Sequence, residues 1–189
     1  MKKILKALFS CSISVILILS IIGCGSSMYN YRVEPTPIKK GTSKYNIKNI
    51  TLSLQHGDGR NIKNKTFKNE LELKKSFKKF INKGLKARSI KGGVKDLQLD
   101  ININYKRTYN WGGNSLNKPE FSYSVNVYNS SDKLLVDFSI PLSKTKHAYF
   151  KENVVLMKIA AFQWDAENEP EDIELISKLI VEDLFEIGN

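Results

Sequence analysis

The nine residues LQLDININY, at positions 97–105, decide the fold of this chain, because apolar and polar side chains alternate there without interruption. Successive side chains of a β-strand point to opposite faces of a sheet. One face of this strand therefore carries Leu, Ile and Tyr, and the other carries Gln, Asp and Asn. Such a pattern is typical of a sheet that is covered on one side and open to solvent on the other.

Three further segments show a similar alternation. Residues 45–54 (YNIKNITLSL) and 121–128 (FSYSVNVY) place apolar side chains at every second position along much of their length. Residues 134–140 (LLVDFSI) come after the turn-forming sequence Asn-Ser-Ser-Asp at 129–132. We expect 121–128 and 134–140 to pair as an antiparallel hairpin.

Residues 69–86 have the periodicity of a helix instead. Their apolar side chains recur at helical spacing and would form one face: Leu73, Phe77, Phe80, Ile81 and Leu85. Asn69 is suited to cap the N-terminus of this helix, and two glutamates in the first turn suit the positive end of its dipole. Lysines occupy the opposite face.

Two segments near the C-terminus complete the element order. Residues 171–187 predict a helix, preceded by Pro170, a residue favoured in a first helical turn. Residues 151–164 are ambiguous, because their length and alanines favour a helix whereas their β-branched residues favour a strand. We expect a helix there, with two helices packed on one face of the sheet.

The resulting order is β-α-β-β-β-α, with the ambiguous segment before the last helix. The fold class that this order predicts is α+β: a two-layer sandwich in which helices cover one face of a small mixed or antiparallel sheet. A strand–helix–strand opening favours a crossover between parallel strands. We expect a single α+β domain at 44–189, long enough to bury a core without disulfides.

The N-terminus has the three parts of a secretory leader. Lysines 2, 3 and 6 precede an uncharged apolar stretch, and Gly23 provides a small residue for cleavage. The sequence Ile21-Ile22-Gly23-Cys24 resembles a lipobox, the site at which bacterial lipoproteins are cut and acylated. An uncleaved membrane-spanning helix is the alternative, but it needs about 20 apolar residues, more than this run provides.

This interpretation predicts three regions. Residues 1–23 are a signal peptide, Cys24 carries the lipid, including a palmitate-type acyl chain, and 24–43 form a flexible tether with Pro35 and Pro37. Gly25 stands where an aspartate would resemble an inner-membrane retention signal. We therefore expect a lipid-anchored protein of the cell envelope and, if the source is a diderm bacterium, a location on the periplasmic face of its outer membrane.

The charge is distributed unevenly. The whole chain has a net charge of +11, and residues 24–110 contain 20 Lys and Arg against 6 Asp and Glu. Residues 111–189 contain 7 against 13. A basic half favours an anionic partner, although solvated surface lysines explain it equally well. In this compartment the partner would be an envelope protein or an anionic glycolipid, and not nucleic acid.

The leader motif and the element order together resemble small Gram-negative outer-membrane lipoproteins of the YajG-like and LptE-like kind. The matching pieces are an amphipathic helix ending near a glycine (Leu73 to Gly84-Leu85), the alternating strand at 97–101, and the hairpin at 125–138. The resemblance implies a binding or assembly role in the envelope, without catalysis. The lysine-rich helix face and the loop at 111–119 do not belong to the resemblance.

Two sets of side chains are candidates for binding. The first is the lysine stripe on the predicted helix, which would meet an anionic surface: Lys74, Lys75, Lys78, Lys79, Lys83 and Lys86. The second would stack a ligand at the end of the central strand: Tyr105, Arg107, Tyr109 and Trp111. Solvated surface and edge packing, respectively, are the alternatives.

Catalysis has little support in the sequence. The histidines, His56 and His147, leave open an envelope hydrolase as the alternative function. After cleavage only Cys24 remains as a cysteine, so no thiolate nucleophile or thiolate metal site is expected. The acidic residues at 165–174 lack the regular spacing of a calcium loop and suit a helix start. We expect no enzyme activity, cofactor or metal.

Overall fold

A computed structural model describes residues 30–31, 37–57, 67–88, 95–110 and 115–188. Its strands are β1 (Asn30–Tyr31), β2 (Ser43–His56), β3 (Lys95–Arg107), β4 (Glu120–Tyr128) and β5 (Leu134–Lys144). Its helices are α2 (Glu70–Arg88), α3 (Tyr149–Ala160) and α4 (Glu169–Glu186). The predicted leader, the predicted lipobox at Ile21–Cys24 and Trp111 lie outside the described residues.

The strands form one mixed sheet in the order β1-β5-β4-β3-β2. The pair β2–β3 is parallel, joined by the crossover helix α2, and the other three pairs are antiparallel. The predicted hairpin is present, with Val125 opposite Phe138. The α+β fold class predicted from the sequence is therefore confirmed.

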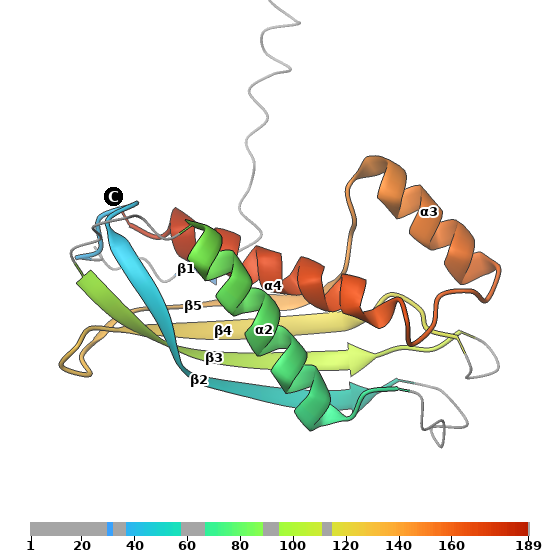
Figure 1. The fold of residues 1–189 in the computed structure, drawn as a ribbon, viewed down its shortest axis with the longest axis horizontal. Coiled ribbons are helices and arrows are strands. Elements are labelled where there is room, and N and C mark those ends of the chain that lie inside the picture. The colour runs from blue at the N-terminus through green and yellow to red at the C-terminus, as the bar shows by residue number, and fades with distance from the viewer. Residues whose placement is uncertain (1–29, 32–36, 58–66, 89–94, 111–114, 189) are drawn as a thin grey trace, which may run out of the picture.

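Helices α2 and α4 cover one face of this sheet (Figure 1). The apolar side chains of β3 and β4 face them and are almost completely buried: Leu97, Leu99, Ile101, Ile103, Tyr105, Phe121, Tyr123, Val125 and Val127. The alternate positions form a polar outer face, on which Asn104 donates a hydrogen bond of 3.1 Å to Ser122. The alternation at 97–105 thus corresponds to a strand with one buried and one polar face, as predicted.

The start of α2 is fixed by a reciprocal capping pair. Asn69 Oδ1 accepts a 3.0 Å hydrogen bond from the backbone N–H of Glu72, and Glu72 Oε2 accepts one of 2.9 Å from the N–H of Asn69. This arrangement satisfies backbone donors that a helix start leaves unpaired. The predicted apolar face is buried through Leu73, Phe77, Ile81 and Leu85, whereas Phe80 is only partly buried.

Most of the ambiguous segment at 151–164 is helical and belongs to helix α3. This helix does not lie on the sheet. In Figure 1 it stands apart, beyond the end of the sheet and above α4. Its inward residues Val155 and Ile159 form a small separate core with Leu116 and Trp164. The two helices that cover the sheet are α2 and α4, which also contact each other (Figure 1).

The chain joins the domain earlier than the tether boundary at residue 43 implies. Ile38 is buried in the main core, and Lys40 forms a 2.5 Å ion pair with Glu186 at the end of α4. Ser43 is the first residue of β2 and pairs with Lys95. Residues 37–43 are therefore part of the packed structure.

Candidate functional site

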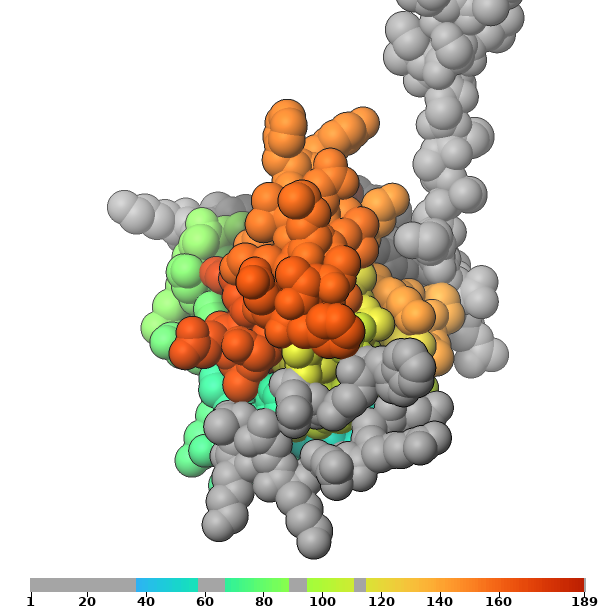
Figure 2. All heavy atoms as spheres, turned by 90° about the vertical axis from the view of Figure 1, so that its right-hand side faces the viewer, coloured from blue at the N-terminus to red at the C-terminus, as the bar shows by residue number. Residues whose placement is uncertain are grey.

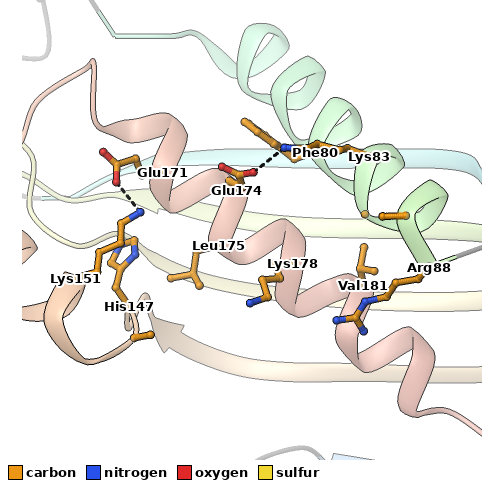
Figure 3. A pocket seen from close by; sticks show the side chains of 13 residues that line it. Phe80, Lys83, Arg88, His147, Lys151, Glu171, Glu174, Leu175, Lys178 and Val181 are labelled. Carbon is orange, nitrogen blue, oxygen red and sulfur yellow. Dashed lines mark hydrogen bonds and ion pairs between the residues drawn. The ribbon is translucent and has the colours of Figure 1, made fainter.

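A groove of about 440 Å³ lies between α2 and α4 and reaches the start of α3 (Figure 3). Thirteen residues line it: Phe80, Lys83, Gly84, Ala87, Arg88, His147, Ala148, Lys151, Glu171, Glu174, Leu175, Lys178 and Val181. We call this feature the helical groove. Its position follows from the fold, because two helices that cover one face of a sheet leave a furrow between their outer surfaces.

Gly84 sets the depth of the helical groove. A Cβ atom at this position would lie 3.0 Å from Cγ2 of Val181, closer than nearly all natural contacts of this kind. A glycine on α2 therefore lets α4 approach, and Val181 packs directly against the backbone of α2. The residues Leu175 and Ala87 add further apolar lining.

The rim of the helical groove is charged. Lys83 Nζ lies 3.2 Å from Glu174 Oε1 across the groove, and Lys151 Nζ lies 2.8 Å from Glu171 Oε2 (dashed lines in Figure 3). The hydrogen bond from Lys151 lowers the pKa of Glu171, so this carboxylate is ionised at neutral pH. Exposed pairs of this kind contribute at most about 1 kcal/mol, and a binding partner can exchange them.

His147 forms a rigid wall at one end of the groove. Its side chain is buried, its Nε2 lies 3.2 Å from Asp172 Oδ1, and its ring meets Trp164 edge-on. Trp164 Nε1 donates a 3.1 Å hydrogen bond to the other oxygen of Asp172. Glu152 Oε2 accepts a 2.7 Å bond from the backbone N–H of His147. These contacts are those of a structural histidine.

His56 lies in a different place, beside a smaller hollow of about 220 Å³ at the ends of β2 and β3. Its Nδ1 is 3.2 Å from the hydroxyl of Tyr109, and the two rings stack with centroids 6.3 Å apart. Desolvation, aided by the charge of Arg107, lowers the pKa of His56, so the ring is neutral at pH 7. Desolvation raises the pKa of Tyr109, which keeps the hydroxyl protonated.

The structure separates the members of the predicted stacking set. Tyr105 and Arg107 are buried and bind Glu169, so neither presents a free face to a ligand. Tyr109 is partly buried and contacts His56 and the edge of Phe67. Trp111 is outside the described residues. The alternative interpretation, packing at the strand end, describes Tyr105 and Arg107.

The lysine stripe is present on α2, but its members differ. Lys75, Lys78, Lys79 and Lys86 are exposed, whereas Lys74 is partly buried. Lys83 belongs to the rim of the helical groove and is paired with Glu174. The stripe therefore offers four exposed lysines to a partner. A fifth, Lys83, is available only after its ion pair with Glu174 breaks.

Four of the acidic residues between 165 and 174 have specific partners. Glu169 binds Arg107, Glu171 binds Lys151, Asp172 binds His147, and Glu174 binds Lys83. Acidic character near a helix start was visible in the sequence, but these long-range partners were not. Across the described residues, no group of three or more His, Cys, Asp or Glu side chains is arranged to hold a metal ion.

Helix α3 carries a second unusual surface, which the sequence did not single out. Its large apolar side chains face solvent: Tyr149, Phe150, Val154, Leu156, Met157 and, just after the helix, Phe162. Figure 2 shows this helix projecting from its end of the molecule. The apolar run was visible in the sequence, but a buried helix was the simpler explanation for it.

Within the described ranges, no helix combines the length and apolar character needed to cross a membrane. No protein-family model matches the chain, and no curated protein matches it. A solved Helicobacter pylori structure, described as a candidate homolog of neuraminyllactose-binding hemagglutinin, shows 12% identity over 82% of this chain and 89% of that one. The TM-score is 0.32, too low to carry an argument about function.

Proposed function

We propose that this chain is a lipid-anchored protein of the bacterial envelope, that it acts by binding and not by catalysis, and that its binding site is the helical groove. The observation that carries the proposal is the composition of this groove. Apolar side chains line its interior, and exchangeable ion pairs form its rim. An apolar centre surrounded by a polar rim is how protein-binding sites are commonly built.

The charges of the groove suggest the chemistry of the partner. Four cationic residues line it, namely Lys83, Arg88, Lys151 and Lys178, against the two carboxylates Glu171 and Glu174. A third carboxylate, Glu182, is not a lining residue but pairs with Arg88 and Lys178. A segment of an envelope protein that carries both apolar and acidic side chains would fit this arrangement, because its carboxylates can replace Glu171 and Glu174.

The arrangement of the histidines supports binding over hydrolysis. His147 is buried and held by Asp172 and Trp164, and His56 is paired with a tyrosine hydroxyl whose pKa is raised. An activated nucleophile requires a lowered pKa or a base that accepts its proton. Neither the raised pKa of Tyr109 nor the buried position of His147 provides this.

The lipid anchor determines where binding occurs. The lipobox Ile21–Cys24 supplies the cysteine that is acylated. Buried acyl chains contribute about 0.8 kcal/mol per CH₂, so several chains hold a protein on a membrane almost permanently. Metabolic labelling with a radioactive fatty acid tests this step: the wild type should be labelled and Cys24→Ser should not. Equal labelling of both would exclude the anchor.

A pull-down from detergent-solubilised membranes tests the groove. Lys83→Glu combined with Lys178→Glu reverses two charges on its rim, and we expect at least a tenfold loss of the co-purified protein. The matched control, Lys75→Glu with Lys79→Glu, reverses two exposed charges elsewhere on α2 and should retain the partner. If both variants retain it, the helical groove is not the binding site.

A further inference from the structure

We propose that the outer face of α3 inserts into the interface of an anionic bilayer, as a second membrane contact that is independent of the lipid on Cys24. The residues that form this outer face are Phe150, Val154 and Met157, which are spaced four and three positions apart and therefore lie on one side of the helix. The buried residues Val155 and Ile159 lie on the opposite side.

The apolar side chains on the outer face of α3 are strongly exposed to solvent. Tyr149, Phe150 and Met157 are 91%, 88% and 72% exposed, respectively. Single exposed apolar residues are common on protein surfaces, but a contiguous patch of large ones indicates contact with a membrane or a partner. Here large exposed apolar side chains occur from the first residue of the helix to Met157. The polar Glu152 instead lies largely buried and binds Lys118.

The charges beside the patch favour a lipid surface. Glu152 is the only acidic residue of α3 and is largely buried, so the exposed part of the helix presents no carboxylate. Lys151 and the partly buried Lys158 lie on one flank of the outer face, where Lys151 is paired with Glu171 and would have to exchange it for a phosphate. Lys146 is exposed just before the helix. The next carboxylate, Asp165, follows the buried Trp164. Lysines beside an apolar face can bind lipid phosphates while their stems remain in the interface.

The size and position of α3 also suit an interface. A helix of 12 residues is about 18 Å long, too short to span a bilayer but long enough to lie in its surface. The helix stands beyond the end of the sheet, so its outer face can reach a flat surface (Figures 1 and 2). The aromatic rings of Tyr149 and Phe150 are of the kind that anchors proteins at the headgroup level.

The residue after the C-cap of α3 adds another exposed apolar side chain. Phe162, 58% exposed, lies two residues after the end of α3 and has φ of 58°, a left-handed conformation that favours glycine. The helix is closed there by a 2.8 Å hydrogen bond from the N–H of Gln163 to the carbonyl of Lys158. A bulky apolar residue therefore occupies a position at which glycine, which has no Cβ atom, would fit the backbone better.

The test uses the full chain reconstituted in vesicles, with an environment-sensitive fluorescent residue at position 150 or 157. A matched probe at Asn102, on the polar outer face of the sheet, serves as the control. In vesicles of phosphatidylethanolamine and phosphatidylglycerol we expect a blue shift and quenching by brominated lipids at 150 and 157, with neither at 102. The quenching should weaken at least twofold in neutral phosphatidylcholine vesicles.

Two results would overturn the proposal. The first is a probe at 150 that remains in a water-like environment in anionic vesicles. The second is a probe that becomes shielded only when solubilised envelope proteins are added, which would make α3 a protein-docking surface. Both results can be interpreted whether or not Cys24 is acylated. If acylation fails, the full chain still carries the apolar stretch before Cys24 as its first membrane contact.

Discussion

The guanidinium of Arg107 and the carboxylate of Glu169 form a buried two-point ion pair, with Nε–Oε1 at 2.7 Å and Nη2–Oε2 at 3.0 Å. Tyr105 donates a 3.3 Å hydrogen bond to the same carboxylate, and Arg107 also donates to the carbonyl of Lys68 at 2.7 Å. The pair joins the end of β3 to the first residue of α4, so it fixes the helix that forms one wall of the groove.

Breaking this pair should destabilise the protein strongly. Glu169→Gln leaves the Arg107 charge buried without its partner, and we expect the free energy of unfolding to fall by about 3–5 kcal/mol. The control Glu174→Gln removes an exposed pair on the same helix and should cost less than about 1 kcal/mol. Urea unfolding measures both, and equal losses would contradict the structural role of Arg107.

Tyr45 should make the fold sensitive to alkaline pH. Its burial raises the pKa of its hydroxyl to about 12, whereas the unfolded-state pKa is about 10. Because the folded pKa is the higher one, this contribution to stability is complete below pH 10 and is lost as pH rises through 12. Tyr45→Phe should reduce the loss of stability between pH 10 and 12, with little effect at pH 7.

The alkaline titration of Tyr45 has a matched control. Tyr149→Phe changes an exposed tyrosine and should leave the alkaline loss unchanged. Part of the slope should remain in Tyr45→Phe, because burial also raises the pKa of Tyr105. Thermal unfolding across a pH series is the measurement. Identical alkaline curves for the wild type and Tyr45→Phe would show that this hydroxyl does not resist ionisation.

The close approach at Gly84 should not tolerate a large side chain. We expect Gly84→Leu to lower the free energy of unfolding by about 1–3 kcal/mol, because the new atoms meet Val181. Val181→Ala in the same chain should recover part of this loss. Ala87→Leu, at an exposed position of the same helix, is the control and should be nearly neutral. An equally small effect at both positions would argue against tight α2–α4 packing.

Phe162→Gly should stabilise the fold. The left-handed conformation at this position costs a non-glycine residue about 1–2 kcal/mol, and the exposed ring loses little packing when it is removed. The neighbouring change Ala161→Gly, at φ of −85°, relieves no such strain and should not stabilise. Calorimetry would distinguish them. Destabilisation by Phe162→Gly would mean that the ring contributes to folding.

Much of the fold could be predicted from the sequence because its signals are local. The alternation at 97–105 and the capping residue Asn69 depend on near neighbours, and both have the expected structure. The helix at 149–160 was harder to place, since an apolar run gives no information about whether it faces a core or the solvent. The packing of Ile38 depends on contacts with distant segments, which a tether-like composition conceals.

The candidate site was much less predictable. The rim pairs Lys83–Glu174 and Lys151–Glu171 join residues 91 and 20 positions apart, so a short stretch of sequence contains neither pair. One member of the stacking set was unpredictable for a related reason: Arg107 has a buried partner on α4, which the strand sequence does not show. A basic residue within a strand pattern, with an acidic helix start later in the chain, is a signal that could have suggested this pair.

Site-specific photocrosslinking in growing cells tests the central claim, partner binding in the helical groove, most directly. A photoreactive phenylalanine analogue replaces Lys178, an exposed lining residue, and in a second strain it replaces Asn102 on the opposite, polar face of the sheet. We predict a discrete adduct with an envelope protein from position 178 and none from position 102. The absence of an adduct from 178, or the same adducts from both positions, would contradict the account.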